Sequence, residues 1–252
     1  MKYLRPNIFK NICNNIHDVV YCTESAEFYS KIIESALNDA IKSIKNTYKD
    51  DIKLIPIMKN LEKLLNGNLY NKMMKIILEK SNTNVICHGD LWINNLMFHY
   101  NTINNKCDNC YLIDLQSIRY TSPIIDLLHF IYTSTIKQVR YQYLYQLLND
   151  YHNSLIDTLT IHLYNNVNIL DAYKKQFNIN NIINEFKNKS IYGFGVGLWL
   201  LPAITFHPDN IINLDNVTLN DITNNKANNL LTDDYHLRVK DIIWEFMESG
   251  LI

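Results

Sequence analysis

The sequence predicts an α+β fold that is predominantly helical. Apolar residues recur every three or four positions over most of the 252 residues, which is typical of helices packed on a core. Residues 85–116 differ, because their apolar runs are short and are separated by turn-forming residues. We find no internal repeat and no linker. We therefore expect a single unit with a helical part at 1–84, a loop-rich part at 85–135 and a second helical part at 136–252.

Three helices are predicted in the first part, at residues 25–48, 52–65 and 70–80. The first carries apolar residues at helical spacing, namely Phe28, Ile32, Ala36, Ala40 and Ile44. Gly67, the only glycine before residue 85, ends the second helix. Residues 1–24 are weakly patterned, and we assign no element to them.

The second helical part is predicted from periodicity and from helix-end signals. Pro123 suits the first turn of a helix that follows Ser122. A long amphipathic helix at 136–159 carries Val139, Tyr143, Leu147, Tyr151 and Leu155 at intervals of four. Residues 160–181 indicate a helix interrupted by Asn-rich loops, and 207–231 indicate a loop. A last helix is expected at 234–249, with Asp233 as its N-cap and Gly250 as its C-cap.

The apolar stretch 182–206 is predicted to lie in the core. It contains Gly193, Gly195 and Gly197, whose spacing does not fit a dinucleotide-binding loop. We interpret these glycines as positions where helices pack closely. His129, in the helix after Pro123, has no partner that the sequence assigns, and a surface or satisfied core histidine is the default interpretation.

The polar residues that indicate chemistry are concentrated in 85–116. A short buried strand, Val85–Cys87, is followed by His88, Gly89 and Asp90, and glycine permits a tight turn there. Asn95 lies five residues after Asp90, and a later apolar run ends at Asp114. A carboxylate, a carboxamide and a second carboxylate thus lie beside strand ends, on loops that can converge.

Phosphoryl transfer with magnesium needs these groups. One carboxylate positions the attacking hydroxyl and accepts its proton, and oxygen ligands hold the metal on the nucleotide phosphates. Singly, Asp90 could be an ordinary turn residue and Asn95 an ordinary polar residue in an Asn-rich chain. Their combined spacing and strand context favour a shared site.

The motif His88-Gly89-Asp90-Leu91-Trp92 with Asn94-Asn95, followed by Ile113-Asp114-Leu115-Gln116, resembles the ecdysteroid kinase-like family. This family, also described as CHK kinase-like, belongs to the aminoglycoside phosphotransferase and choline kinase superfamily. Ser122-Pro123-Ile124-Ile125-Asp126-Leu127 fits the same family. The strong resemblance covers residues 85–160, and a weaker one continues to Arg238.

The resemblance implies a protein-kinase-like fold and a role for each residue. Asp90 would be the catalytic base. Asn95 and Asp114 would bind Mg²⁺ and, through it, the phosphates of ATP. His88 and Asp126 would support the loop. The acceptor would be a small-molecule hydroxyl, such as an ecdysteroid or another apolar alcohol, with a choline- or aminoglycoside-type acceptor as an alternative.

One departure from the family pattern concerns residues 1–84. They contain no glycine-rich loop and no lysine in a Val-Ala-Ile-Lys-like strand, and Lys53 is the nearest candidate. We therefore expect only the C-terminal lobe of such a kinase, without its N-terminal lobe, and an incomplete enzyme. The alternative is a non-catalytic remnant or binding module.

Composition gives expectations about partners and compartment. The formal net charge is −1 and no basic stripe occurs, so nucleic acid is not expected as a partner. No apolar run is long enough to predict a membrane span. Five cysteines, an odd number, and a first segment without a signal-peptide pattern favour reduced thiols and a cytoplasmic location.

Overall fold

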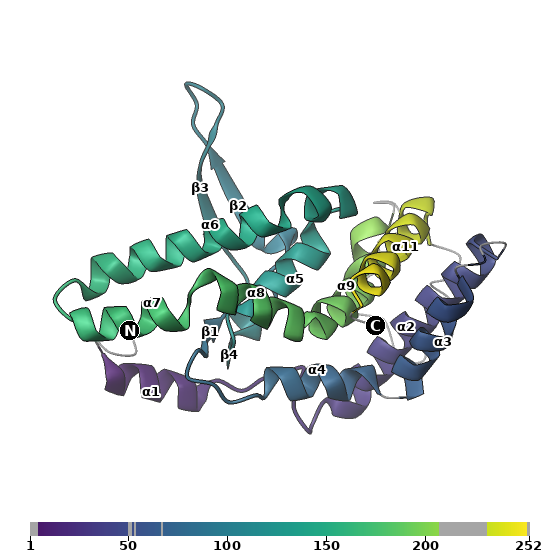
Figure 1. Ribbon diagram of the computed structural model, residues 1–252, viewed down its shortest axis with the longest axis horizontal. Coiled ribbons are helices and arrows are strands. Elements are labelled where there is room, and N and C mark those ends of the chain that lie inside the picture. The colour runs from purple at the N-terminus through teal and green to yellow at the C-terminus, as the bar shows by residue number, and fades with distance from the viewer. Residues whose placement is uncertain (1–4, 50–51, 53, 67, 207–230, 251–252) are drawn as a thin grey trace.

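A computed structural model describes residues 5–49, 52, 54–66, 68–206 and 231–250. Within these residues the protein is mostly helical, with two small antiparallel sheets (Figure 1), which confirms the α+β, predominantly helical prediction. Lys53, Gly67 and nearly all of the predicted loop at 207–231 lie outside the described residues. None of the helices in the described part is both long and apolar enough to cross a membrane.

The first part of the chain is mainly helical where it is described, with non-helical segments at 16–25 and 78–84. These are α1 (Pro6–Asn15), α2 (Ala26–Thr47), α3 (Leu54–Asn66) and α4 (Leu69–Ile77). The sequence analysis missed α1, which begins with a proline at a position that suits the first helical turn. Because α1 has no buried residue, its formation leaves little trace in the apolar pattern.

The buried face of α2 agrees with the predicted stripe at Ala40 and Ile44 but not at its other positions. The structure buries Ile33, Leu37, Ala40, Ile41 and Ile44, whereas Phe28 is 41% exposed. Two faces of this helix are apolar, and contacts with α4 and with a later helix, α9 (Ser190–Thr205), select the one that is covered. Spacing alone cannot make that choice, since both faces satisfy the helical period.

The second part adds six described helices after the sheet region. They are α5 (Ile124–Ser134), α6 (Lys137–Leu163), α7 (Val167–Gln176), α8 (Ile179–Asn188), α9 (Ser190–Thr205) and α11 (Asp233–Glu248). The interruption predicted at 160–181 is confirmed by the breaks between α6, α7 and α8. The stripe predicted for α6 is wrong in detail, because Tyr143 is exposed and Leu148 is buried instead.

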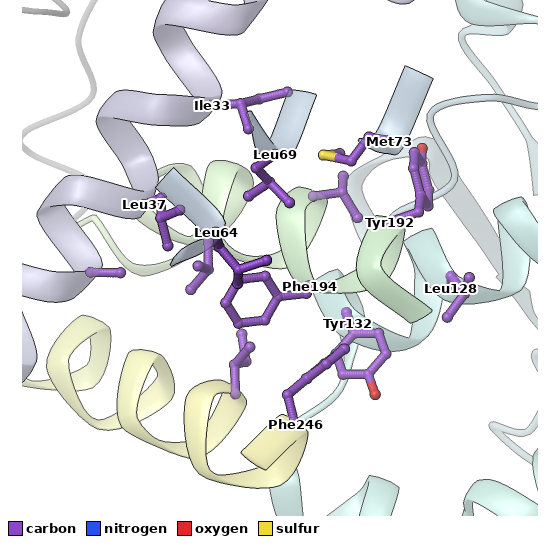
Figure 2. Packing of buried hydrophobic residues seen from close by; sticks show 14 of the residues in the cluster. Ile33, Leu37, Leu64, Leu69, Met73, Leu128, Tyr132, Tyr192, Phe194 and Phe246 are labelled. Atoms are coloured by element: carbon purple, nitrogen blue, oxygen red, sulfur yellow. The ribbon is translucent and has the colours of Figure 1, made fainter. Parts of the chain in front are cut away.

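Helix α9 lies at the centre of the core, as its apolar sequence predicted (Figures 1 and 2). Phe194 is fully buried and contacts Phe246 of α11 edge to face, with ring centroids 5.1 Å apart. Tyr132 of α5 packs against the same Phe246 at 5.0 Å. These aromatic contacts join α5, α9 and α11 into one cluster.

The glycines of α9 mark close helix packing, as we predicted. A Cβ atom built on Gly193 would lie 2.5 Å from the ring of Tyr132, and one on Gly195 would lie 2.2 Å from the sulfur of Met73. A Cβ on Gly197 would meet nothing nearer than 3.3 Å. Gly193 therefore allows α5 and α9 to approach each other closely.

The ends of α11 required one correction. The N-cap is Thr232, whose side-chain oxygen accepts a hydrogen bond from the backbone N–H of Tyr235 at 3.1 Å, and Asp233 is the first helical residue. Aspartate is on average a better N-cap than threonine, so local preference favours Asp233, and the structure uses Thr232 instead. Gly250 follows the helix with a φ of +68°, the left-handed conformation expected after a helix end.

The strands form two separate pairs near the middle of the chain. Strand β1 (Val85–Cys87) pairs with β4 (Arg119–Thr121), with Cys87 opposite Arg119. Strand β2 (Leu96–Tyr100) pairs with β3 (Cys107–Leu112), with Leu96 opposite Leu112. The β2–β3 ribbon stands out from the helical body (Figure 1), whereas the β1–β4 pair lies within it. The sequence analysis did not predict β4.

The packing at Gly193 leads to a paired prediction. Gly193→Ala should destabilise the protein by about 1–3 kcal/mol, because the new methyl group meets an aromatic ring that cannot move aside cheaply. Gly197→Ala is the matched control and should be near neutral, because the gain of about 1 kcal/mol from the higher helix propensity of alanine offsets a tight contact at 3.3 Å. Urea denaturation measures both. Equal effects of the two substitutions would contradict this account of the α5–α9 contact.

Candidate active site

The loop after β1 is fixed to α5 by one carboxylate. Asp126, in the first turn of α5, accepts hydrogen bonds from the backbone N–H of His88 at 2.7 Å and of Gly89 at 3.0 Å. Burial raises the pKa of Asp126, and the two backbone donors oppose that rise. Farther along α5, Ser134 Oγ accepts a hydrogen bond from the backbone N–H of Ile93 at 3.0 Å. One helix thus holds both ends of the segment that carries Asp90.

Gly89 is required by the shape of this loop. Its φ is +84°, and a Cβ atom there would lie 1.9 Å from the carbonyl oxygen of Ser117. Any side chain would therefore collide with the backbone before β4 as well as strain the residue itself. The turn between β1 and Asp90 can pass this close to its neighbour only with glycine.

His88 connects the loop to the end of the β2–β3 ribbon. Its Nε2 lies 2.8 Å from the carbonyl oxygen of Ile113, so Nε2 must carry the proton that it donates. Its Nδ1 lies 3.4 Å from the backbone N–H of Asp90, which donates to it. The imidazole ring of His88 is therefore hydrogen-bonded to the backbone of Asp90 on one side and to the backbone of Ile113, the residue before Asp114, on the other.

Asp90 and Asn95 are in direct contact. Asn95 Nδ2 donates to the backbone oxygen of Asp90 at 2.8 Å and to its carboxylate Oδ2 at 3.1 Å. Burial raises the pKa of Asp90, the bond from Asn95 opposes this, and the nearby charge of Asp114 adds to the rise. The amide of Asn95 is buried and its nitrogen faces Asp90, so its Oδ1 is left for another partner.

Asp114 is brought to the same region through the backbone. The N–H of Ile113, the residue before Asp114, donates a hydrogen bond to the carbonyl oxygen of Asn95 at 3.1 Å. This bond holds the backbone at Asp114 next to that of Asn95. Asp114 is exposed and has a φ of +60°, a left-handed conformation that aspartate tolerates better than most residues. Gln116 Nε2 lies 3.3 Å from its carboxylate.

A buried polar layer behind Asp90 was missed by the sequence analysis. His129 of α5 places Nε2 3.4 Å from Asp90 Oδ1, so it is neither a surface histidine nor a histidine satisfied within the core. Burial, aided by Arg119 and His88, lowers the pKa of His129 to about 3, which keeps the ring neutral. Arg119 Nε in turn lies 3.3 Å from Asp18. No local motif marks these residues, since they converge only in three dimensions.

One cavity of the described part of the chain lies away from these residues. It has a volume of about 600 Å³ and lies between α1, β1, α6 and α7, with Phe9, Ile86 and Tyr173 in its lining. None of the five predicted site residues lines it. The contacts described above around Asp90 are hydrogen bonds, and this cavity is not part of that arrangement.

In a comparison with models of known families, residues 1–164 match the ecdysteroid kinase-like family. The chain belongs to the ecdysteroid kinase-like family. The match includes the helices of the first 84 residues, over which the sequence motifs showed no resemblance, and it covers every residue of the candidate site. No curated protein and no solved structure matches the chain. Membership in the ecdysteroid kinase-like family implies a kinase-like phosphotransferase.

The geometry at Gly89 gives a prediction with a matched control. Gly89→Ala should cost about 2–5 kcal/mol, the sum of left-handed strain and a collision with backbone. Gly250→Ala should cost only about 1–2 kcal/mol, since Gly250 also has a positive φ but has no atom within 4 Å of a built Cβ. Urea denaturation compares the two variants. A Gly89→Ala variant no less stable than Gly250→Ala would show that the loop does not pass Ser117 as described.

Proposed function

We propose that this protein transfers the terminal phosphoryl group of ATP to the hydroxyl of a small molecule, with Asp90 as the catalytic base. The observation that carries the proposal is the linkage of three residues. Asn95 donates a hydrogen bond to the carboxylate of Asp90. The ring of His88 and the backbone of Asn95 are each hydrogen-bonded to the backbone of Ile113, the residue before Asp114. This is the set of groups that phosphoryl transfer requires, since positioning and electrostatics supply most of its catalysis.

Asp90 suits the role of a base that receives a proton from an alcohol. Its side chain is 30% exposed, so a substrate hydroxyl can reach it, while partial burial raises its pKa and makes the carboxylate a better proton acceptor. The bond from Asn95 holds the carboxylate in one orientation. His88 and Asp126 then act as supports, because each fixes the backbone beside Asp90 and neither needs to contact substrate.

Asn95 and Asp114 would hold Mg²⁺. Asn95 Oδ1 has no hydrogen bond within the described part of the chain, and the carboxylate of Asp114 is exposed with Gln116 as its neighbour. Both offer the hard oxygen ligands that Mg²⁺ prefers, and the remaining positions would be filled by phosphate oxygens and water. When bound, the metal neutralises charge on the phosphates of ATP.

An apolar alcohol, such as an ecdysteroid, is the acceptor that we propose. The family supports it. So do the exposed apolar side chains next to the site residues in the chain, since Ile93 is 43% exposed and Leu115 is 57% exposed. Such residues would favour an apolar acceptor over choline or an aminoglycoside.

Removing the carboxylate of Asp90 should slow turnover strongly. Asp90→Asn should lower kcat by about 10²–10⁴-fold, the usual contribution of a general base, while the fold is retained. Phosphorylated product is measured with steroid alcohols, choline and an aminoglycoside as acceptors. Asp108→Asn is the control, because Asp108 is an exposed aspartate on β3 that contacts only His99 among its described partners. Unchanged turnover in Asp90→Asn would exclude this mechanism.

Nucleotide binding should depend on the metal and on Asp114. ATP with Mg²⁺ at 100 times its dissociation constant should stabilise the protein by about 2.7 kcal/mol, and Asp114→Asn should reduce this gain. The rise in Tm on titration measures the effect, with EDTA present in the control. No stabilisation at millimolar ATP with Mg²⁺ would favour a non-catalytic protein.

A further inference from the structure

Helix α5 contacts the loop of Asp90 at three points along one face. Asp126 and Ser134 bind backbone N–H groups, and they therefore fix the path of the chain. The third residue, His129, lies three positions after Asp126, so its side chain projects from the same face. It differs from the other two because it faces a side chain, the carboxylate of Asp90, at 3.4 Å.

The tautomer of His129 follows from its two neighbours. Nδ1 lies 3.2 Å from the hydroxyl of Tyr192 on α9, and Nε2 faces Asp90 Oδ1. An ionised carboxylate can only accept, so Nε2 carries the proton and Nδ1 accepts from Tyr192. Both His129 and Tyr192 are buried, which leaves little freedom for either ring to turn away.

The Nε2–H group of His129 has no other acceptor among the described residues. It is fully buried and forms no hydrogen bond at the present geometry. Leaving a buried donor without a partner destabilises a protein, and most buried polar groups in native structures are therefore hydrogen-bonded. The acceptor that it faces is Asp90 Oδ1 at 3.4 Å, so Tyr192, His129 and Asp90 lie in one row.

We infer that His129 is a positioning residue for Asp90. Its neutral Nε2–H holds carboxylate Oδ1, while Asn95 holds Oδ2, so that the carboxylate is fixed from both sides. The inference rests on the proposed function, in which Asp90 is the base. A neutral donor suits this task, because it orients the carboxylate without neutralising it as an imidazolium would.

Substitutions at His129 separate positioning from packing. His129→Phe keeps an aromatic ring and removes the donor. It should lower kcat by about 100-fold, the cost of a misplaced catalytic group, and leave KM for the alcohol unchanged. His129→Gln keeps an amide N–H and should restore most of kcat. The control is His152→Phe on α6, because His152 contacts only the adjacent Asn153 among its described partners.

Two kinetic results would overturn the inference while leaving the proposed function intact. One is an unchanged kcat in His129→Phe when Asp90→Asn is inactive. The other is a His129→Gln variant as impaired as His129→Phe, which would indicate that His129 matters only for packing. Tm values of all variants are measured alongside the kinetics, and a His129→Phe variant that fails to fold leaves the decision to the experiment below.

A spectroscopic measurement tests the contact between His129 and Asp90, on which the inference depends, without any activity. In the full-length protein labelled with ¹⁵N-histidine, two-bond ¹H–¹⁵N correlations report which ring nitrogen is protonated, and His129→Gln assigns the signal. We expect a proton on Nε2, a shift of that nitrogen in Asp90→Ala, and a shift of Nδ1 in Tyr192→Phe. A proton on Nδ1, or no response to Asp90→Ala, overturns the inference. If the wild type phosphorylates no alcohol, the proposed function fails. The NMR measurement still shows whether His129 contacts Asp90.

Discussion

The arrangement of the site depends on the two hydrogen bonds that Asp126 accepts from the backbone of His88 and Gly89. They join the end of β1 to the first turn of α5. Asp90 follows immediately, so its position is set relative to a helix packed in the core and not by a free loop. Charge-assisted bonds of this kind are each worth about 1.5–3 kcal/mol, which is sufficient to hold a short loop in one conformation.

The attachment of the loop to α5 also determines which other side chains lie near Asp90. Because α5 is fixed beside the loop, His129 lies against the carboxylate, and the close approach at Gly193 brings α9 and Tyr192 behind it. The polar layer continues to Arg119, which pairs with Asp18 and lies over the ring of Tyr21 at 5.1 Å. Residues from the start, middle and end of the chain thus share one buried environment.

The exposed side of the site has a different character. The β2–β3 ribbon stands apart from the helical body (Figure 1), and its described side chains are mostly exposed. Its base is nevertheless tied to the loop, since Ile113 binds both the ring of His88 and the backbone of Asn95. Asp114 is therefore accessible but anchored, a combination that suits a residue expected to bind a ligand from solvent.

The sequence by itself determined the helical class, the short strands and the motif of Asp90, Asn95 and Asp114, because periodicity, turn residues and motif spacing are local properties. The motif also indicated the family that the comparison then showed. Only the tertiary structure decided which face of α2 is buried, that Arg119 lies on a strand, and that His129 faces Asp90. Those outcomes depend on contacts between distant segments, and a lone buried histidine or arginine has no local pattern that reveals its partner.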